Sequence, residues 1–341
     1  MTKASFSIGA YDVAPGTRKD IELPLARLVT GTPVSLPVLV FHGSQDGPVI
    51  WINAALHGDE ISGIEIIRRV TELLNAETLR GTFIAAPIVN VHGFLTGDRY
   101  LPDRRDLNRS FPGSAKGSLA SRIAHIFMTE IVSRCSVGID LHSGSDHRTN
   151  LAQIRADLDD EKTAELASVF AAPMMIHSKT RDGSLRKEAT SSGASVLVFE
   201  GGEAWRLDQA SIRTGVDGVL RVLAHEGMID LPPGDQPPPT SNISRKTRWM
   251  RAPQSGIGRL RVGLGDSVAE GQLVGEIYDA FGTRLGNVTS RTDGVVVGLA
   301  LDALVNRGDA VINIAEILQE KETDTGVKSN EVELDVTEGD A

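Results

Sequence analysis

The sequence predicts an α/β protein with a mixed, mostly parallel central sheet, followed by a small all-β domain. Between residues 36 and 227, apolar strand-like runs alternate with segments of helical spacing. A proline-rich stretch follows, and beyond it short apolar runs broken by glycines replace the helical pattern. Alternation of strands and helices is typical of a sheet covered by helices, whereas closely spaced short strands are typical of an all-β fold.

The elements of the first part follow from their apolar patterns. Short apolar runs that end at polar or glycine-containing turns predict buried strands, and apolar residues spaced three and four apart predict helices. The expected strands are 36–43, 48–56, 81–91, 137–144 and 194–202, and the expected helices are 60–76, 118–134, 160–171 and 209–227.

The domain boundary is expected at "LPPGDQPPPTSN", residues 231–242, which holds five of the fifteen prolines. Proline stiffens the chain and removes backbone donors, so this stretch is interpreted as a semi-rigid linker. It would separate a domain over 1–230 from a small β domain over 243–318, and an acidic tail at 319–341 is expected to be disordered.

Two segments of the β domain, 251–279 and 289–316, resemble each other. Such a half-repeat is similar to the barrel-sandwich fold of biotinyl and lipoyl carrier domains. A carrier presents a lysine at a hairpin tip, but the comparable stretch "GTRLGNVTSRTDG" contains arginines and no lysine. A cap or accessory domain is therefore favoured over a carrier.

Charge and cysteine content exclude several classes of protein. Lysines and arginines number 35 against 45 acidic residues, which gives a net charge of −10. Most of that charge lies after residue 319, so the body favours neither nucleic acid nor a membrane surface. The single cysteine, Cys135, cannot form an internal disulfide, and we find neither a signal-peptide pattern nor an apolar run of the ~20 residues that span a bilayer. A cytoplasmic protein is expected.

A candidate metal site begins at "HGDE", where His57 and Glu60 follow a predicted central strand. Open α/β sheets bind ligands at the carboxyl ends of their strands. Catalytic zinc uses three protein ligands and an open position, and two histidines with one glutamate form a common set. His142 supplies the second histidine at the end of another strand, and Asp140, two residues earlier, is placed to orient it.

The turn also has a reading without a metal, in which Asp59 caps the following helix and Glu60 lies exposed in its first turn. Even with the metal site, Asp59 is expected to cap or shape the turn. His92 and His147 remain alternatives to the chosen histidines.

Two further stretches carry charges that suit catalysis. The loop 97–113 holds four arginines, which bind carboxylates and stabilise oxyanions, although a solvated, salt-bridged loop would have the same composition. The strand 194–202 reaches Glu200 before two glycines, and a carboxylate beside a metal is placed to act as general base. Glu203, beyond the glycines, is the alternative base.

Together and in this order, "HGDE", "DLNRSFPG", "DLHSG" and "FEGGE" resemble the succinylglutamate desuccinylase/aspartoacylase family, which is related to the zinc carboxypeptidases. The likeness covers roughly residues 45–225. It implies a zinc-carboxypeptidase-like three-layer α/β/α domain with one Zn²⁺ ion per chain. The ligands implied are His57, Glu60 and His142, with Glu200 as the general base.

The resemblance also implies how substrate is held. Asn108 and Arg109 resemble residues that bind the substrate carboxylate, and Arg186, in "SLRKEA", resembles a further substrate contact. Arg99 resembles the arginine that polarises the scissile carbonyl, with Arg104 and Arg105 as alternatives.

The expected function is zinc-dependent hydrolysis of the amide bond of an N-acyl amino acid or a related small N-acyl compound. The alternatives are a metallocarboxypeptidase that acts on peptides and a non-catalytic binding protein on the same fold. The expected partner is the small-molecule substrate, with no nucleic acid and no membrane, and a homo-oligomer is compatible with the sequence.

Overall fold

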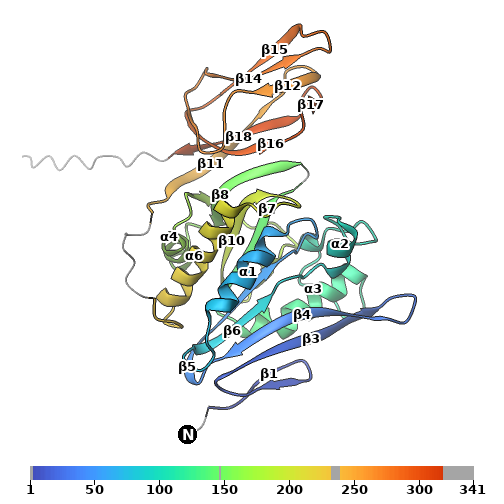
Figure 1. The fold of residues 1–341 in the computed structure, drawn as a ribbon, viewed down its shortest axis with the longest axis vertical. Coiled ribbons are helices and arrows are strands. Elements are labelled where there is room, and N and C mark those ends of the chain that lie inside the picture. The colour runs from blue at the N-terminus through green and yellow to red at the C-terminus, as the bar shows by residue number, and fades with distance from the viewer. Residues whose placement is uncertain (1–2, 146, 232–238, 318–341) are drawn as a thin grey trace, which may run out of the picture.

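The structure, a computed structural model, describes residues 3–145, 147–231 and 239–317 (Figure 1). Most of the predicted linker at 231–242 and all of the acidic tail at 319–341 lie outside the described residues. In the view of Figure 1 the N-terminal part lies below and the strands of the C-terminal part lie above it.

Twelve strands form one mixed sheet in the order β13-β16-β18-β11-β9-β8-β10-β7-β5-β6-β4-β3. At its centre β10, β7, β5 and β6 run parallel, and β8 and β4 flank them in the antiparallel sense. The predicted α/β class with a mixed sheet is confirmed. The strand bounds are β3 Thr17–Arg27, β4 Pro33–His42, β5 Gln45–Ala54, β6 Arg80–Ala86, β7 Val137–Gly144, β8 Arg148–Ala156, β9 Met174–His177, β10 Ser195–Glu203, β11 Asn242–Arg251, β13 Ser267–Val268, β16 Gly294–Ala300 and β18 Ala310–Ile317.

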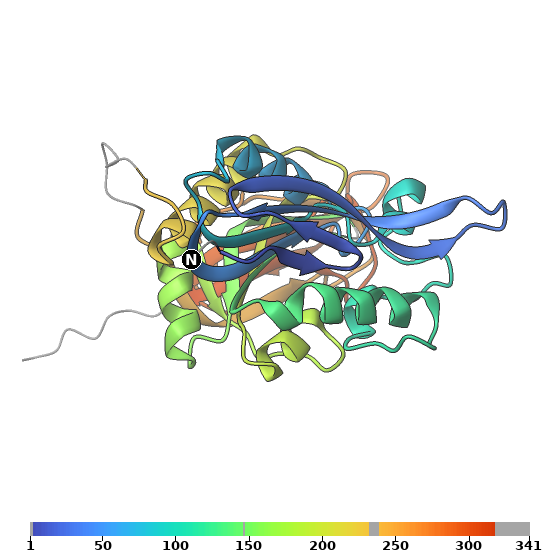
Figure 2. The same cartoon turned by 90° about the horizontal axis from the view of Figure 1, so that it is seen from below.

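Helices cover both faces of the parallel strands (Figure 2). On one face, α1 (Ser62–Leu73), α4 (Glu161–Phe170) and α6 (Gln209–His225) bury a core that includes Phe170 and Phe199. On the other face, α3 (Leu119–Glu130) and α5 (Leu185–Ser191) pack around Trp51 and Phe127. The short helix α2 (Val91–Thr96), the 3₁₀ turns Leu107–Arg109 and Val132–Arg134, and the hairpin of β1 (Phe6–Ile8) and β2 (Tyr11–Val13) complete this part.

Every helix and strand expected from the sequence overlaps an observed one, but several observed elements were not expected. The strands β3, β8 and β9 and the helices α2 and α5 are absent from the prediction. The strand β8 begins with the polar residues "RTN", which conceal its later alternation, and α5 is too short to show a helical period.

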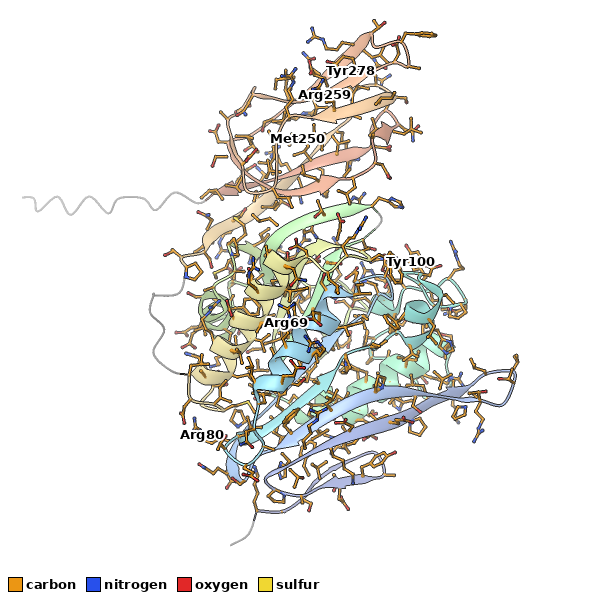
Figure 3. All side chains as sticks on the ribbon, viewed as in Figure 1. Arg69, Arg80, Tyr100, Met250, Arg259 and Tyr278 are labelled. Atoms are coloured by element: carbon orange, nitrogen blue, oxygen red, sulfur yellow. The ribbon has the colours of Figure 1, made fainter. Side chains whose placement is uncertain are left out.

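The C-terminal part contains only strands between residues 242 and 317, which confirms its all-β character. A second sheet, in the order β15-β14-β12-β17, covers a separate core to which Met250 of β11 belongs (Figure 3). Its strands are β12 Gly256–Leu260, β14 Leu273–Tyr278, β15 Arg284–Thr289 and β17 Leu304–Val305.

Five strands of the large sheet close on themselves. The strand β8 pairs with β9 and also with β16, while β11 pairs with β9 and β18, and β18 pairs with β16. We call this circuit of β8, β9, β11, β18 and β16 the strand ring. Met174, Ile176, Val297 and Ala315 form a buried cluster contributed by both parts of the chain. The sheet therefore runs on from one part into the other, and the division into domains at 230 and 243 stays a prediction.

None of the helices in the described ranges is long and apolar enough to cross a membrane.

Candidate active site

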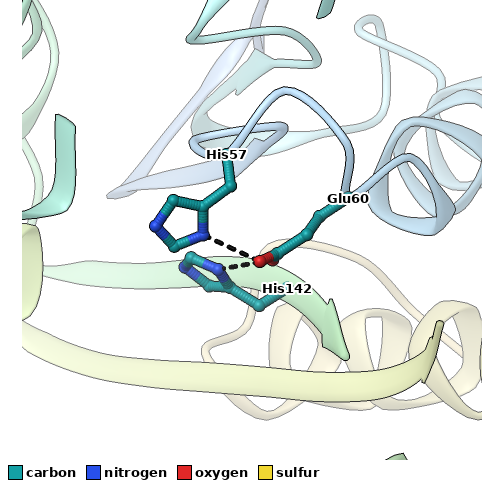
Figure 4. A group of neighbouring side chains, drawn as sticks. All are labelled: His57, Glu60 and His142. Atoms are coloured by element: carbon teal, nitrogen blue, oxygen red, sulfur yellow. Dashed lines mark hydrogen bonds and ion pairs between the residues drawn. The ribbon is translucent and has the colours of Figure 1, made fainter. Parts of the chain in front are cut away.

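Two neighbouring parallel strands bring the three predicted metal ligands together. His57 and Glu60 lie in the turn between β5 and α1, and His142 lies near the end of β7. Ala54 of β5 is paired with Leu141 of β7, so the ends of both strands meet at one edge of the sheet. Figure 4 shows the two imidazoles next to each other, both facing the carboxylate of Glu60.

The turn that carries His57 and Glu60 is fixed by close packing. A Cβ atom on Gly58 would lie 2.1 Å from the carbonyl carbon of Gly93 in α2, so only glycine lets the two backbones approach. Asp59 does not cap α1, which has no side-chain cap; its Oδ2 instead accepts a hydrogen bond from Ser145 Oγ at 3.0 Å. The expectation that Asp59 caps the helix is wrong, because the helix begins at Ser62 and its N-cap residue is Ile61.

The donor atoms of the three side chains converge. Nδ1 of His57 lies 2.8 Å from Glu60 Oε1, and Nδ1 of His142 lies 2.8 Å from Glu60 Oε2. One ligand atom from each residue lies within 4.8 Å of the other two, and all three residues are buried. The backbone N–H of Ser143 also donates to Glu60 Oε2, at 3.1 Å.

On the side of each imidazole that faces away from Glu60, a carboxylate lies near Nε2 and orients the ring. His142 Nε2 lies 2.9 Å from Asp140 Oδ2, and His57 Nε2 lies 3.3 Å from Asp106 Oδ1. Asp140 in turn accepts a hydrogen bond from Asn53 at 2.6 Å. With Nε2 protonated toward these carboxylates, the Nδ1 lone pairs and the Glu60 oxygens all face one point. Such a set needs a positive charge between its members, and a divalent cation fits this requirement.

The electrostatics of the cluster agree with that requirement. Burial alone would lower the pKa of His142, but the carboxylates of Asp140 and Glu60 outweigh it and raise that pKa well above its ordinary value. Burial alone would also lower the pKa of His57, but the carboxylate of Glu60 outweighs burial, and the pKa of His57 is raised. Burial alone would raise the pKa of Glu60, yet the two imidazoles hold it well below its usual range. The cluster therefore favours bound positive charge at neutral pH.

Glu200 lies beside this cluster because β10 is the neighbour of β7, with Glu200 paired to His142. Its Oε2 accepts a hydrogen bond from Asn150 Nδ2 at 3.0 Å, and its Oε1 lies 4.0 Å from Arg155 Nε. The alternative base, Glu203, lies beyond a register shift in β10 and lines other pockets.

The predicted substrate residues surround the same space. Arg99 Nη1 lies 3.1 Å from Glu60 Oε1, and its Nη2 lies 3.5 Å from Asp106 Oδ2. Asn108 Oδ1 accepts the N–H of Leu185, which fixes the loop against the start of α5. Arg186, on that helix, is 9% exposed, and its buried Nη1 has no hydrogen-bond partner among the described residues. A buried guanidinium with a spare donor suits an anionic ligand.

All eight residues proposed from the sequence line one pocket of about 410 Å³: His57, Glu60, Arg99, Asn108, Arg109, His142, Arg186 and Glu200. Arg104 and Arg105, the alternatives to Arg99, are largely exposed and do not line it. His92 and His147 do not line it either.

Sequence reasoning missed several residues of this pocket, namely Arg148, Asn150, Arg155, Arg181 and Trp249. Three of them come from β8, whose strand pattern was not recognised, and Trp249 comes from β11 in the C-terminal part. Arg148 stacks over the Trp249 ring at 5.2 Å from its centroid. The basic residues of "HRTNLAQIRA" and the short alternation after "RTN" were the sequence signals available for β8.

The fold and this pocket define an α/β protein with a buried His–Glu–His cluster and an adjacent glutamate at the carboxyl ends of central strands. A family model for the succinylglutamate desuccinylase/aspartoacylase catalytic domain matches residues 46–226, which is more than half of the chain. The chain belongs to this family, which confirms the resemblance seen in the sequence.

Similar proteins match this chain over most of their length. N-α-acetyl-L-2,4-diaminobutyric acid deacetylase from Halomonas elongata is 28% identical over 298 residues, which cover 84% of this chain and 87% of that protein. The crystal structure of a succinylglutamate desuccinylase/aspartoacylase from Rhodobacter sphaeroides has a TM-score of 0.77 at 26% identity, over 88% of this chain and 96% of that one. A product-bound structure of the ectoine utilization protein EutE (DoeB) from Ruegeria pomeroyi has a TM-score of 0.79 at 23% identity, over 88% and 95% of the two chains. The last likeness supports the fold alone.

Proposed function

We propose that this chain is a metal-dependent hydrolase that cleaves the amide bond of an N-acyl amino acid or a related small N-acyl compound. The observation that carries the proposal is the convergence of His57, Glu60 and His142 beside Glu200 in an arginine-lined pocket. Family membership and the similarity to an N-acetyl amino acid deacetylase support the choice of amide over other bonds. The helices on both sheet faces suit the three-layer arrangement that the family resemblance implies.

We assign one Zn²⁺ ion per chain to His57, Glu60 and His142, because their donor set matches that of catalytic zinc. Bound there, zinc would supply Lewis-acid catalysis, which polarises a carbonyl and makes water more acidic. Asp140 and Asp106 keep the imidazoles in the tautomer that presents Nδ1 to the ion.

The remaining residues bind the substrate and move protons. Glu200 takes a proton from the attacking water and delivers it to the leaving amine, as a general base and then a general acid. Arg99 stabilises negative charge that develops on the carbonyl oxygen. Asn108 and Arg109 hold the substrate carboxylate, and Arg186, with its spare buried donor, adds a further contact.

The proposal is tested by measuring amine release from a panel of N-acyl amino acids and small peptides, together with elemental analysis of the purified protein. We expect one zinc per chain, release of amine from N-acyl amino acids, loss of activity after chelation and recovery with added zinc. Higher kcat/KM for peptides would favour a carboxypeptidase, and stoichiometric zinc without any hydrolysis would favour a binding protein. The cytoplasmic location and a homo-oligomeric state stay predictions.

A further inference from the structure

We propose that Asn150 is a positioning residue for Glu200, and that the C-terminal strands act on the candidate general base through Asn150. The inference rests on the proposed function, since it assigns Glu200 to proton transfer. Asn150 touches Glu200 directly, and its own position is set by a strand of the C-terminal part.

The hydrogen bond from Asn150 restricts the orientation of the Glu200 carboxylate. Asn150 Nδ2 donates to Glu200 Oε2 at 3.0 Å, and a hydrogen bond to one carboxylate oxygen fixes the orientation of the group. A neutral amide does not exchange protons in the reaction, so Asn150 acts by holding Glu200 rather than by chemistry of its own. Engagement of Oε2 leaves Oε1 as the oxygen that we assign to the attacking water.

Asn150 lies where three strands meet. In β8 it is paired with Gly202 of β10 on one side and with Gly298 of β16 on the other. The Glu200–Gly202 segment of β10 contains a register shift, so the ladder does not hold Glu200 and Asn150 in simple opposition. The pairing with β16 therefore fixes the backbone of Asn150 independently of the strand that carries Glu200.

Gly298 provides the space that the Asn150 side chain occupies. A Cβ atom at Gly298 would lie 3.1 Å from Asn150 Oδ1 and 3.4 Å from Asn313 Cβ. The first distance is shorter than an ordinary van der Waals contact, so a methyl group there would push the Asn150 carboxamide by a few tenths of an ångström relative to Glu200. A residue of the C-terminal part, which does not line the pocket itself, thus determines where the partner of Glu200 lies.

The test compares Asn150→Ala and Asn150→Asp with the parent protein and with Asn287→Ala, an exposed asparagine of β15. Zinc content, kcat and KM are measured on one N-acyl substrate. Both Asn150 variants are expected to keep zinc and to lose at least about tenfold in kcat. Their KM should change much less than kcat, because Asn150 holds Glu200 rather than the substrate. Asn287→Ala should leave kcat and KM unchanged.

Gly298→Ala tests the same inference from outside the pocket. It should lower kcat, as Asn150→Ala does, with KM and zinc content close to those of the parent. The matched control is Gly258→Ala in β12, where the added Cβ would meet its nearest atom at an ordinary 3.5 Å. If the Asn150→Ala protein does not fold, the comparison of Gly298→Ala with Gly258→Ala tests the positioning role instead.

The outcomes separate this inference from the proposed function. If Glu200→Gln abolishes turnover but the Asn150 and Gly298 variants keep the parent kcat, the positioning role is wrong and the proposed function stands. If Glu200→Gln keeps the parent rate, Glu200 is not the base and both assignments are overturned. A purely structural role of Asn150 would lower yield or stability, while the protein that folds keeps the parent kcat and KM, which also contradicts the inference.

Discussion

Glu60 receives an imidazole on each of its two carboxylate oxygens, at 2.8 Å in both cases. On the other side of these rings, Asp140 faces Nε2 of His142 and Asp106 faces Nε2 of His57. Three carboxylates thus surround two histidines in a buried site. At the scale of single residues, this arrangement determines how strongly protons compete with a metal ion.

That competition predicts a pH-dependent zinc affinity. The pKa values of His57 and His142 are raised in the metal-free protein, the latter strongly, after the nearby carboxylates overcome the effect of burial. A raised pKa means that protons occupy the rings up to a higher pH, so zinc has to displace them and binds more weakly as pH falls. Competition with a chromophoric chelator between about pH 8.5 and 6 measures this trend. An affinity that does not change with pH would contradict the assigned ligands.

Replacing His142 by alanine should remove the metal. Catalytic zinc sites hold the ion through three protein ligands, and two ligands retain it poorly. Elemental analysis after dialysis should find less than a tenth of the zinc content of the parent, roughly. His225→Ala, on the outer part of α6, is the matched control and should keep full zinc. Stoichiometric zinc in His142→Ala would remove His142 from the ligand set.

Glu200→Gln should keep zinc and lose most of its turnover. Glutamine has the shape of glutamate but accepts no proton, and general-base catalysis contributes about 10²–10⁴-fold in rate. Steady-state kinetics on an N-acyl substrate, with zinc content measured in parallel, gives the comparison. Glu203→Gln, which alters a carboxylate outside the pocket, should stay close to the parent rate.

At the scale of elements, β11 connects the C-terminal part to the pocket of the candidate active site. It pairs with β9 through Asn242–Ser244, and near its other end Trp249 enters the pocket lining. The Trp249 ring stacks with Arg148 of β8, so two strands far apart in sequence form one wall of the pocket. The cap or accessory role expected for the C-terminal part is compatible with this contribution and stays a prediction.

Trp249→Ala should therefore impair substrate binding more than chemistry. Loss of the ring removes the stacking partner of Arg148, and we expect KM to rise about three- to tenfold with a smaller change in kcat. KM and kcat for N-acyl substrates of increasing acyl length give the measurement. Trp205→Ala is the control, because Trp205 lines a neighbouring pocket only. Equal KM values for Trp249→Ala and the parent would exclude Trp249 from the substrate site.

At the scale of the whole molecule, the strand ring joins the two parts of the chain. A chain that ends at residue 230 lacks β11, β16 and β18, so it exposes the free edges of β8 and β9 together with Met174 and Ile176. Exposed strand edges and apolar surface favour aggregation. We expect this truncation to aggregate, as seen by size-exclusion chromatography, whereas a chain ending at Ile317 keeps every strand of the ring. A monomeric, cooperatively melting 1–230 protein would show that this part folds alone.

The sequence revealed those parts of the site that follow from local rules. His57, Glu60, His142 and Glu200 each stand at the end of an apolar strand, and strands of a parallel sheet present their carboxyl ends at one edge. The order of the strands was not predictable, because nothing local shows that β9 and β11 become neighbours. Asn150 and Trp249 were missed for the same reason: their roles depend on partners fifty or more residues away.

The strand ring also has a consequence for the order of events during protein synthesis. The residues of the His–Glu–His cluster and Glu200 all leave the ribosome before residue 201, but β16 and β18, which complete the ring, are translated only at 294–317. A nascent chain thus carries every residue that we assign to metal binding and proton transfer well before the strand that pairs with Asn150 exists. Long-range strand pairing of this kind forms late. We therefore expect the assigned general base to reach its final position only after β16 has been translated and has paired with β8.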